Sequence, residues 1–174
     1  MKIASVDVVH KSDAGGVHLD IRDEAALVAA YDAMLAAVRR AHPQARIQGV
    51  HLQRFHAGGT EVIIGARRDP QFGPVIVCGL GGIHTEVLKD VSFRLAPLTH
   101  DEAREMIGEL RSIAILQGAR GAAPADLDAL ADCAVRLARL MSDFPSIAEI
   151  DVNPLAAGPA GAIALDARAV MGAA

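Results

Sequence analysis

The chain has 174 residues, 52% of them hydrophobic, which suits one compact domain, whole or divided into two lobes around a cleft, and excludes a second full domain. Its net charge is −4 with acids and bases interspersed, and 3% of its residues are aromatic. It therefore lacks the basic stripe and the stacking platforms of a nucleic-acid-binding protein, its apolar runs are of strand length, and its N-terminus lacks signal-peptide features. We expect a cytoplasmic protein with no nucleic-acid or membrane partner.

The N-terminal segment predicts two short strands separated by a loop. Residues 1–5 are mainly apolar, and a polar, glycine-containing segment follows at residues 7–16. Val17, Leu19 and Ile21 then alternate with polar neighbours, which is typical of a half-buried strand. Because the chain opens inside a strand with no preceding cap or turn, we expect that further residues normally precede it.

The next predicted elements are a long helix and three strands. Apolar residues recur at three- and four-residue spacing over residues 27–38, which predicts an amphipathic helix. A strand is expected at 47–55, and residues 61–69 and 74–80 form a hairpin around the turn sequence DPQFG. The middle of the sheet is therefore predicted to be antiparallel.

Two further helices are predicted in the second half of the chain. Thr99 and Glu102 have the spacing of a capping box, so a helix is expected from about residue 100 to residue 110. A second apolar stripe covers residues 127–141, and Pro145 ends that helix. Helices alternating with antiparallel strands predict the α/β class, in its α+β form.

The C-terminal part contains a pattern typical of a magnesium site. In the strand predicted at 147–153, alternation places Glu149, Asp151 and Asn153 on one face. Hard oxygen ligands without histidine or cysteine suit Mg²⁺, and clustered carboxylates are unfavourable unless a cation joins them. An ordinary solvated polar face explains the same pattern about as well.

The strand expected at residues 162–167 supplies the other half of this pattern. We expect Ala162 and Ala164 to share a face with Asp166, while Ile163 and Leu165 point into the core. The carboxylate of Asp166 then approaches Asn153 over a floor of alanines. This arrangement predicts a pocket made of a carboxylate and an amide.

A second candidate site is the loop at residues 10–16, with sequence HKSDAGG. The backbone N–H groups of Gly15 and Gly16 are candidates to cradle an anion, with the charges of Lys11 and Lys2 alongside. Most glycine pairs after a strand form ordinary turns, so this signal is weak alone. His10 is a candidate acid, base or nucleophile, although most single histidines have no such role.

Five spaced motifs in one order give these patterns a common interpretation. The chain resembles the ATP-grasp region, the beta subunit or beta-like domain, of ADP-forming acyl-CoA synthetases such as acetate–CoA ligase. It is more distantly similar to the nucleotide-binding subunit of succinyl-CoA synthetase. The resemblance covers residues 1 to about 171 and is carried by residues 10–17 (HKSDAGGV), 59–62 (GTEV), 68–74 (RDPQFGP), 79–83 (GLGGI) and 149–155 (EIDVNPL).

The resemblance implies roles for individual residues. Asn153 and Asp166 match the family's magnesium ligands, in agreement with the pocket predicted from the strand pattern. His10 matches the histidine that takes a phosphoryl group relayed from a histidine on another domain. Asp151 matches the acid that supports this step. The resemblance therefore implies Mg²⁺ and ATP or ADP as cofactors and a phosphohistidine as intermediate.

Further positions match the nucleotide site of the family. Lys2 matches a lysine that contacts nucleotide phosphates, and Lys11, Gly15 and Gly16 lie in the loop that would hold them. Arg54 and Phe55 belong to a hinge that would meet adenine through its backbone, and Glu61 lies in a motif that lines the same cleft.

The family's ATP-grasp region has more residues before Lys2 than this chain does. The resemblance therefore implies an ATP-grasp fold truncated in its N-terminal lobe, with residues 1–56 as the remainder of the nucleotide lobe and 57–174 as the C-terminal lobe. Its partners would be CoA-binding and acyl-transferring domains, or an alpha subunit, in an oligomeric enzyme. The isolated chain is expected to bind Mg·ATP weakly or not at all and to be inactive alone.

The implied reaction is acid + CoA + ATP ⇌ acyl-CoA + ADP + phosphate, with the acid unspecified. One alternative is a regulatory or binding module, such as the ATP-grasp regions fused to protein acetyltransferase domains. Another is a structural domain that kept the fold and lost catalysis. Phosphate exchange between ATP and ADP separates the ligase from both alternatives.

Overall fold

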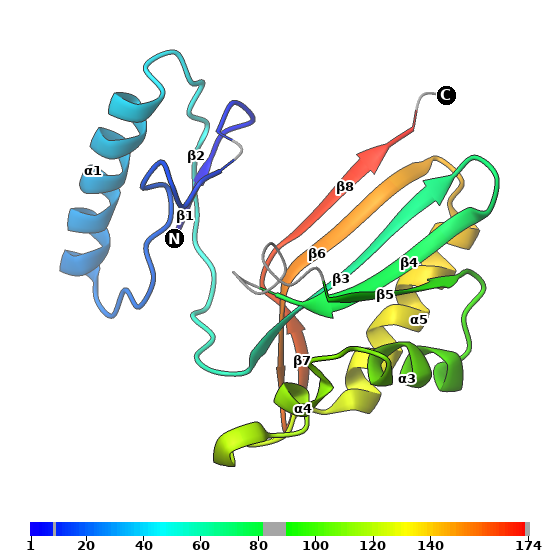
Figure 1. The fold of residues 1–174 in the computed structure, drawn as a ribbon. Helices are drawn as coiled ribbons and strands as arrows, with labels where there is room; N and C mark the ends of the chain where they lie inside the picture. Colours follow the sequence, from blue (N-terminus) through cyan, green and yellow to red (C-terminus); the bar gives the residue numbers. More distant parts are fainter. Residues whose placement is uncertain (9, 82–89, 173–174) are drawn as a thin grey trace. The chain divides into compact units, whose positions relative to one another are not determined.

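The computed structural model of the chain describes residues 1–8, 10–81 and 90–172 (Figure 1). The chain divides into two compact units, Met1–Ala57 and Gly58–Ala174, which we call unit 1 and unit 2. Each unit has a hydrophobic core of its own. The division lies one residue from the boundary expected from the sequence, and what each unit binds remains a proposal.

Unit 1 pairs two short strands with one long helix. β1 (Lys2–Ala4) pairs antiparallel with β2 (Gly49–His51). α1 (Glu24–Ala41) confirms the predicted amphipathic helix, and the side chain of Asp23 caps its first turn by accepting from the N–H of Ala26 at 2.7 Å. The buried apolar residues of the unit are Met1, Ile3, Val8, Ala14, Met34 and Val38.

Two strand predictions in unit 1 need correction. Residues 17–21 form no strand: Val17 makes only an isolated bridge to Lys2, and Leu19 is 68% exposed. The strand predicted at 47–55 is limited to the three residues of β2, because β1 offers only three residues for pairing. Alternation in sequence was present in both segments, but a strand also needs a neighbour along its length.

Unit 2 is built on a six-stranded sheet with the order β5-β4-β3-β6-β7, and β8 also pairs with β6. Every pairing is antiparallel, and the predicted hairpin is formed by β3 and β4. The strand at β5 and the separate β8 were not predicted. The bounds are β3 (Thr60–Asp69), β4 (Gly73–Leu80), β5 (Val91–Leu95), β6 (Ile147–Gly158), β7 (Gly161–Ala164) and β8 (Ala167–Met171).

Helices α3 (His100–Gly108) and α5 (Leu127–Asp143) pack against one face of this sheet (Figure 1). Both were predicted, and the capping box of α3 is formed in full by Thr99 and Glu102. A short helix α4 (Ile113–Leu116) and a 3₁₀ turn η1 (Ala119–Gly121) lie between them and were not predicted. In the part of the chain that the structure describes, no helix is long and apolar enough to cross a membrane.

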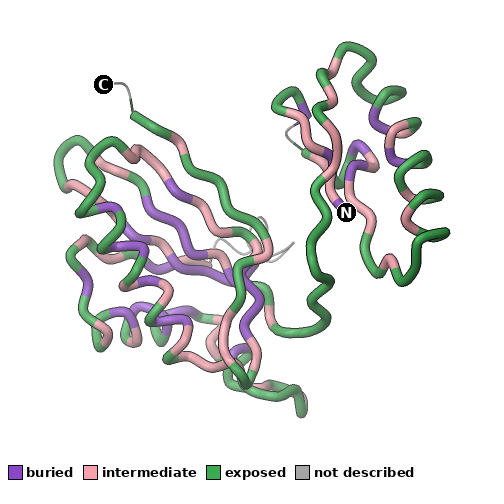
Figure 2. Tube along the Cα trace, turned by 180° about the vertical axis from the view of Figure 1, so that it is seen from behind, coloured by how far each residue is buried: buried purple, intermediate pink, exposed green. Residues whose placement is uncertain are grey.

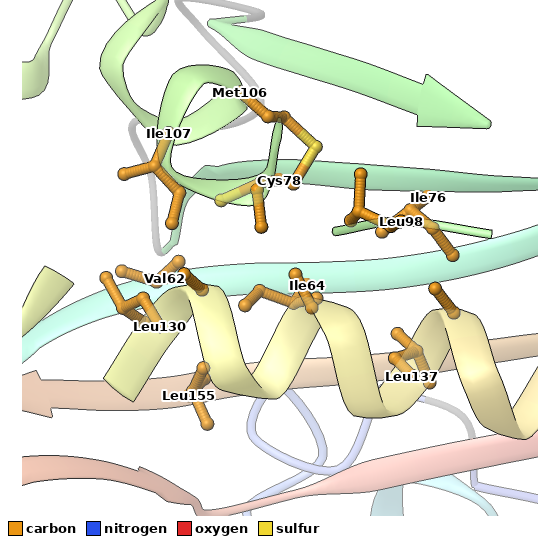
Figure 3. Close-up of a cluster of buried hydrophobic side chains, with 14 of the residues drawn as sticks. Val62, Ile64, Ile76, Cys78, Leu98, Met106, Ile107, Leu130, Leu137 and Leu155 are labelled. Carbon is orange, nitrogen blue, oxygen red and sulfur yellow. The ribbon is translucent and has the colours of Figure 1, made fainter. Parts of the chain in front are cut away.

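The core of unit 2 lies between the sheet and these two helices (Figure 2). Val62 of β3 lies beside Leu130 of α5, Ile64 lies further along the same helix, and Met106 of α3 lies near Cys78 of β4 (Figure 3). Burial raises the pKa of the Cys78 thiol to about 12, so this side chain stays uncharged at neutral pH. The layer of aliphatic and sulfur-containing side chains fixes which face of each strand points away from the helices.

Candidate functional site

The sheet of unit 2 has a second face on which, among the described residues of that unit, no helix packs. Ile64 and Ala66 of β3 belong to the core beneath the helices, so alternation sends Gly65 and Arg67 to this second face. We call it the helix-free face. Its charged residues come from β3, β6 and the start of β8: Glu61, Arg67, Asp69, Glu149, Asp151, Asp166 and Arg168.

A β-bulge in β6 sets the orientation of the strand's second half. Val62 pairs with Leu155 and Ile64 pairs with Val152, so the single residue Ile63 lies opposite two residues, Asn153 and Pro154. Before the bulge, Ile150 and Val152 face the core; after it, Leu155 and Ala157 do. The bulge therefore shifts the alternation by one residue.

This shift corrects the prediction for the residues of β7. Ala162 was expected on the polar face, but it pairs with Ala157 and packs against the core. Ile163 was expected inside, but it is 47% exposed. The expected floor of alanines is therefore wrong, because continuous alternation through Asn153 and Pro154 does not hold.

The approach of Asn153 and Asp166 does not depend on that floor. The backbone N–H of Asn153 donates to the carbonyl oxygen of Asp166 at 3.1 Å. The two residues are therefore cross-strand neighbours, with Asp166 immediately before the first residue of β8. Both residues are exposed, so neither is sealed in the core. One carboxylate oxygen of Asp166 accepts from the N–H of Ala167 at 3.0 Å, which restrains the side chain.

These two side chains fit a magnesium ion in donor chemistry. An amide oxygen and a carboxylate are hard ligands, and Mg²⁺ usually takes only one or two protein ligands and keeps waters or phosphates for the rest. Within the described ranges, no three His, Cys, Asp or Glu side chains form a metal-binding group. A site at Asn153 and Asp166 therefore needs ligands from a bound phosphate or from water.

Asp151 lies beside this pair on the helix-free face. Burial raises the pKa of its carboxyl, and the neighbouring carboxylates of Glu149 and Asp166 raise it as well, while Arg168 lowers it. A Cβ atom added to Gly65 would stand 3.7 Å from a carboxylate oxygen of Asp151. The same atom would lie 3.1 Å from Cγ1 of Val77 and 3.3 Å from the carbonyl oxygen of Ile150, so a glycine suits this closely packed position beside the acid.

The loop at residues 10–16 is organised differently from the prediction. The N–H of Gly15 donates to Ser12 at 3.1 Å and that of Gly16 donates to Lys11 at 2.7 Å, so both amides are used within the loop. The glycines have a packing role instead. Gly15 has φ +69, and a Cβ atom there would lie 2.9 Å from the Cβ of Ala37; one on Gly16 would lie 2.6 Å from Ile3.

The other predicted residues of unit 1 surround this loop or follow it. His10 is exposed, and Lys11 and Lys2 are half-buried. Arg54 and Phe55 are exposed in the irregular segment after β2. The structure therefore groups the predicted phosphate loop and hinge in unit 1, apart in sequence and in core from the carboxylates of unit 2.

Glu61 lies on β3 of unit 2, where it is exposed. The N–H of Gly81 donates to its carbonyl oxygen at 2.7 Å, and a Cβ atom on Gly81 would lie 2.9 Å from the Cβ of Glu61. Gly81 is thus a glycine because another backbone passes close to it. The end of this motif, residues 82–83, lies outside the described residues.

Sequence analysis missed two residues of the helix-free face, Arg67 and Arg168. Arg67 lies directly opposite Glu149, and Arg168 lies directly opposite Asp151. Arg168 belongs to β8, which was not predicted because it is short and rich in alanine. The alternation of Asp166 with Arg168 was the available signal, since it places both on the face of Asp151.

Residues 1–171 match the family described as the ATP-grasp domain. The chain belongs to this family. It is 48% identical over 172 residues to acetate–CoA ligase (ADP-forming) I of Archaeoglobus fulgidus, which covers 99% of the chain and 25% of that protein. It is 47% identical over 171 residues to the beta subunit of the corresponding Pyrococcus furiosus enzyme, covering 98% of the chain and 74% of the subunit. The chain thus spans a quarter of one relative and about three quarters of the other.

Solved structures of the same family have the same fold. The dinucleotide forming acetyl-coenzyme A synthetase 1 of Ca. Korarchaeum cryptofilum, in complex with coenzyme A, Ca-AMPCP and HgCl⁺, superposes with a TM-score of 0.94 at 44% identity, covering 98% of this ATP-grasp chain and 74% of that one. A form of it with coenzyme A and Mg-AMPPCP, described with its phosphohistidine segment pointing towards the nucleotide binding site, has a TM-score of 0.84 at 40% identity over 98% and 75% of the two chains.

Proposed function

We propose that the chain is the nucleotide-binding part of an ADP-forming acyl-CoA synthetase. The observation that carries this proposal is the cross-strand pair Asn153 and Asp166, which lies beside Asp151 on the helix-free face of an ATP-grasp domain. The relatives named acetate–CoA ligases favour a ligase over a regulatory module or an inactive structural domain. The acid substrate is left open, because its selection belongs to other parts of the enzyme.

In unit 2, Asn153 and Asp166 are the proposed magnesium ligands. The ion supplies positive charge to the phosphates of ATP or ADP during transfer. The bound metal and nucleotide in the Korarchaeum structures support this choice of cofactors. Glu61 lies on the same sheet and is the proposed lining of the nucleotide site.

In unit 1, Lys2 and Lys11 are the proposed phosphate contacts, and Arg54 and Phe55 the proposed adenine contacts. His10 is the proposed nucleophile. Its ring nitrogen forms a bond to the terminal phosphorus of ATP as the bond from that phosphorus to the bridging oxygen breaks, and ADP leaves with the electron pair. Asp151 of unit 2 is the proposed acid that supports this step, and a neutral imidazole supplies the attacking nitrogen.

The phosphoryl group then passes to a histidine of the CoA-binding part and on to the acid. Transfer to the acid gives an acyl phosphate, and the thiol of CoA displaces phosphate from it. The proposed partners are therefore the CoA-binding and acyl-transferring domains, or an alpha subunit, in an oligomeric enzyme of the cytoplasm.

The test is phosphorylation of the assembled ligase with Mg·ATP labelled on the terminal phosphate. We expect an acid-labile, alkali-stable label on His10 of this chain, besides the label on the histidine of the CoA-binding part that takes the group from it. The His10→Ala variant should lose both this label and acyl-CoA formation while keeping its thermal unfolding midpoint, because His10 is exposed.

Two further variants separate the metal site from the nucleophile. Asp166→Asn should weaken binding of Mg·ADP but leave the metal-free nucleotide affinity unchanged. His18→Ala, a histidine outside the proposed site, is the matched control. Full turnover in His10→Ala would contradict the relay, and label on another residue of the chain would move the nucleophile there.

A further inference from the structure

Two arginines of the helix-free face lie on either side of its acidic strand. Arg67 projects from β3 and Arg168 from β8, and β6 runs between these two strands. Both arginines are exposed. Within the described part of the chain, neither is held in a salt bridge, in contrast to Arg22, Arg46, Arg94, Arg104 and Arg139.

The register places both guanidinium groups within reach of one point above Asp151. Arg168 is directly opposite Asp151, and Arg67 is diagonal to it, two residues along β3 from Gly65. Adjacent strands are about 4.8 Å apart, so each arginine needs to cross only one strand spacing. Gly65 pairs with Asp151 and contributes no side chain of its own, while Val77 of β4 lies on its other side, with Cγ1 3.1 Å from where a Cβ atom of Gly65 would stand.

A phosphoryl group that approaches the helix-free face meets net negative charge, which the two arginines would offset. Glu149, Asp151 and Asp166 give three negative charges over neighbouring strands, and they repel a phosphoryl oxygen. Planar guanidinium groups bind phosphoryl oxygens through two parallel N–H donors. Arg67 and Arg168, neither of which forms a salt bridge with another described residue, add positive charge that offsets this repulsion beside a magnesium ion.

We propose that Arg67 and Arg168 form a clamp that holds the transferring phosphoryl group over Asp151. This inference rests on the proposed function and adds two residues that bind the oxygens of the group while it moves between the nucleotide and the histidine. Neither arginine takes a proton or forms a bond to phosphorus. Their contribution is electrostatic and directional.

The competing explanation is that each arginine only neutralises the acid opposite it. The two explanations predict different rates for a variant in which the acid is also removed. If Arg67 serves only Glu149, then Arg67→Gln combined with Glu149→Gln restores the wild-type rate. If Arg67 binds the phosphoryl group, the double variant stays as slow as Arg67→Gln alone.

The experiment measures the rate of phosphohistidine formation from Mg·ATP in the assembled ligase, together with the dissociation constant of Mg·ADP. Arg67→Gln and Arg168→Gln should each slow phosphorylation by about 100-fold or more, the usual effect of removing one donor to a developing charge. The Mg·ADP dissociation constant should change by less than about 3-fold, because ADP lacks the transferred group. Arg168→Lys should restore part of the rate, since it keeps the charge but loses the paired donors.

Arg139→Gln is the matched control, because Arg139 is exposed on α5 at the helix-covered side of the sheet. It should phosphorylate at the wild-type rate. Wild-type rates in both Arg67→Gln and Arg168→Gln would overturn the clamp alone, as would rescue by Glu149→Gln. Failure of the wild-type ligase to form any phosphohistidine would overturn the proposed function and the clamp with it.

Discussion

The two units differ in how their cores are closed. Unit 2 buries side chains from a six-stranded sheet and two long helices, and its central strands β4, β3 and β6 have neighbours on both edges. The described part of unit 1 has a smaller core, built on one helix, two strands of three residues each and the loop between β1 and α1. A two-stranded ribbon is marginally stable in water, whereas three or more strands against a helix support an independent fold.

This difference determines how firmly the proposed site residues of each unit are held in place. The proposed metal ligands and Asp151 lie on or beside strands whose positions are set by a ladder of hydrogen bonds and a packed core. His10 and Lys11 lie in a loop that is held by its own backbone hydrogen bonds and by two glycines packed against α1 and β1. We expect the proposed metal ligands of unit 2 to be rigid and the loop of His10 in unit 1 to depend on few contacts.

The largest expected effect is loss of the smaller core. Met34 in α1 and Leu130 in α5 are both fully buried. Truncation of either to alanine costs about 2–5 kcal/mol. In unit 1 this approaches the stability that so small a core supplies, so Met34→Ala should unfold unit 1 and leave unit 2 folded.

Hydrogen exchange of backbone amides, measured for each unit separately, checks this prediction. Leu130→Ala should lower protection in unit 2 without unfolding it. Val28→Ala, a truncation at a 55% exposed position of α1, is the control and should change stability by less than about 0.5 kcal/mol. Equal loss of protection in both units of Met34→Ala would mean that they unfold as one cooperative body.

A smaller effect is expected at a contact that joins the sheet of unit 2 to its long helix. Arg68 donates to the carbonyl oxygens of Met141 at 2.6 Å, Ile147 at 3.3 Å and Phe144 at 3.4 Å, near the C-terminal end of α5. Positive charge is favourable there because the last carbonyl groups of a helix lack partners. Arg68→Met should lower the unfolding free energy of unit 2 by about 1.5–3 kcal/mol in urea denaturation.

Its neighbour supplies the control. Arg67 points to the other face of the same strand, and Arg67→Met should change the unfolding free energy by less than about 0.5 kcal/mol. If both variants were equally stable, the contact at the end of α5 would contribute nothing to the fold.

The smallest effect concerns an ion pair on the surface of unit 1. The Arg46 side chain donates to Asp7 at 3.1 Å and its backbone N–H at 2.8 Å, and these hydrogen bonds lower the pKa of the Asp7 carboxyl from 3.8 to about 2. Because this pKa is lower in the folded protein than in the unfolded chain, the carboxylate stabilises the fold at pH values above the unfolded pKa. This contribution is lost as the pH falls towards 2.

Asp7→Asn should therefore destabilise unit 1 at pH 7 but have almost no effect at pH 2. Denaturation of both proteins at a series of pH values measures the difference, which should shrink between about pH 5 and pH 2. Asp20→Asn tests a pair that joins residues only two apart in sequence, and it should have a smaller effect at pH 7 because it closes no loop. A difference independent of pH would show that Asp7 acts through packing.

The sequence predicted the long elements correctly because their signals are local. The apolar stripe of α1, the capping box of Thr99 and Glu102, and the turn sequence before Gly73 each need only a few neighbouring residues. The approach of Asn153 to Asp166 was also predicted, although the alternation from which residues 162–167 were assigned to faces was wrong. Five ordered motifs gave the family, which the match over residues 1–171 confirms.

The errors involve partners that are distant in the chain. Residues 17–21 alternate like a strand but make only an isolated bridge, from Val17 to Lys2. β8 pairs with β6 although its own sequence has a weak strand signal. The face assigned to Ile163 was wrong because a bulge opposite Ile63 depends on pairing with β3. The roles of His10, Asp151, Asn153 and Asp166 stay predictions until the phosphorylation experiments are made.

The bulge in β6 means that the number of residues in that strand determines which side chains face the core. Because one extra residue at Asn153–Pro154 separates two stretches of opposite phase, deletion of a single residue there would turn Leu155 and Ala157 out of the core. Substitutions can change the chemistry of the strand without this penalty, but insertions and deletions cannot. Engineering or evolutionary change in this segment is therefore limited to replacing side chains at constant length.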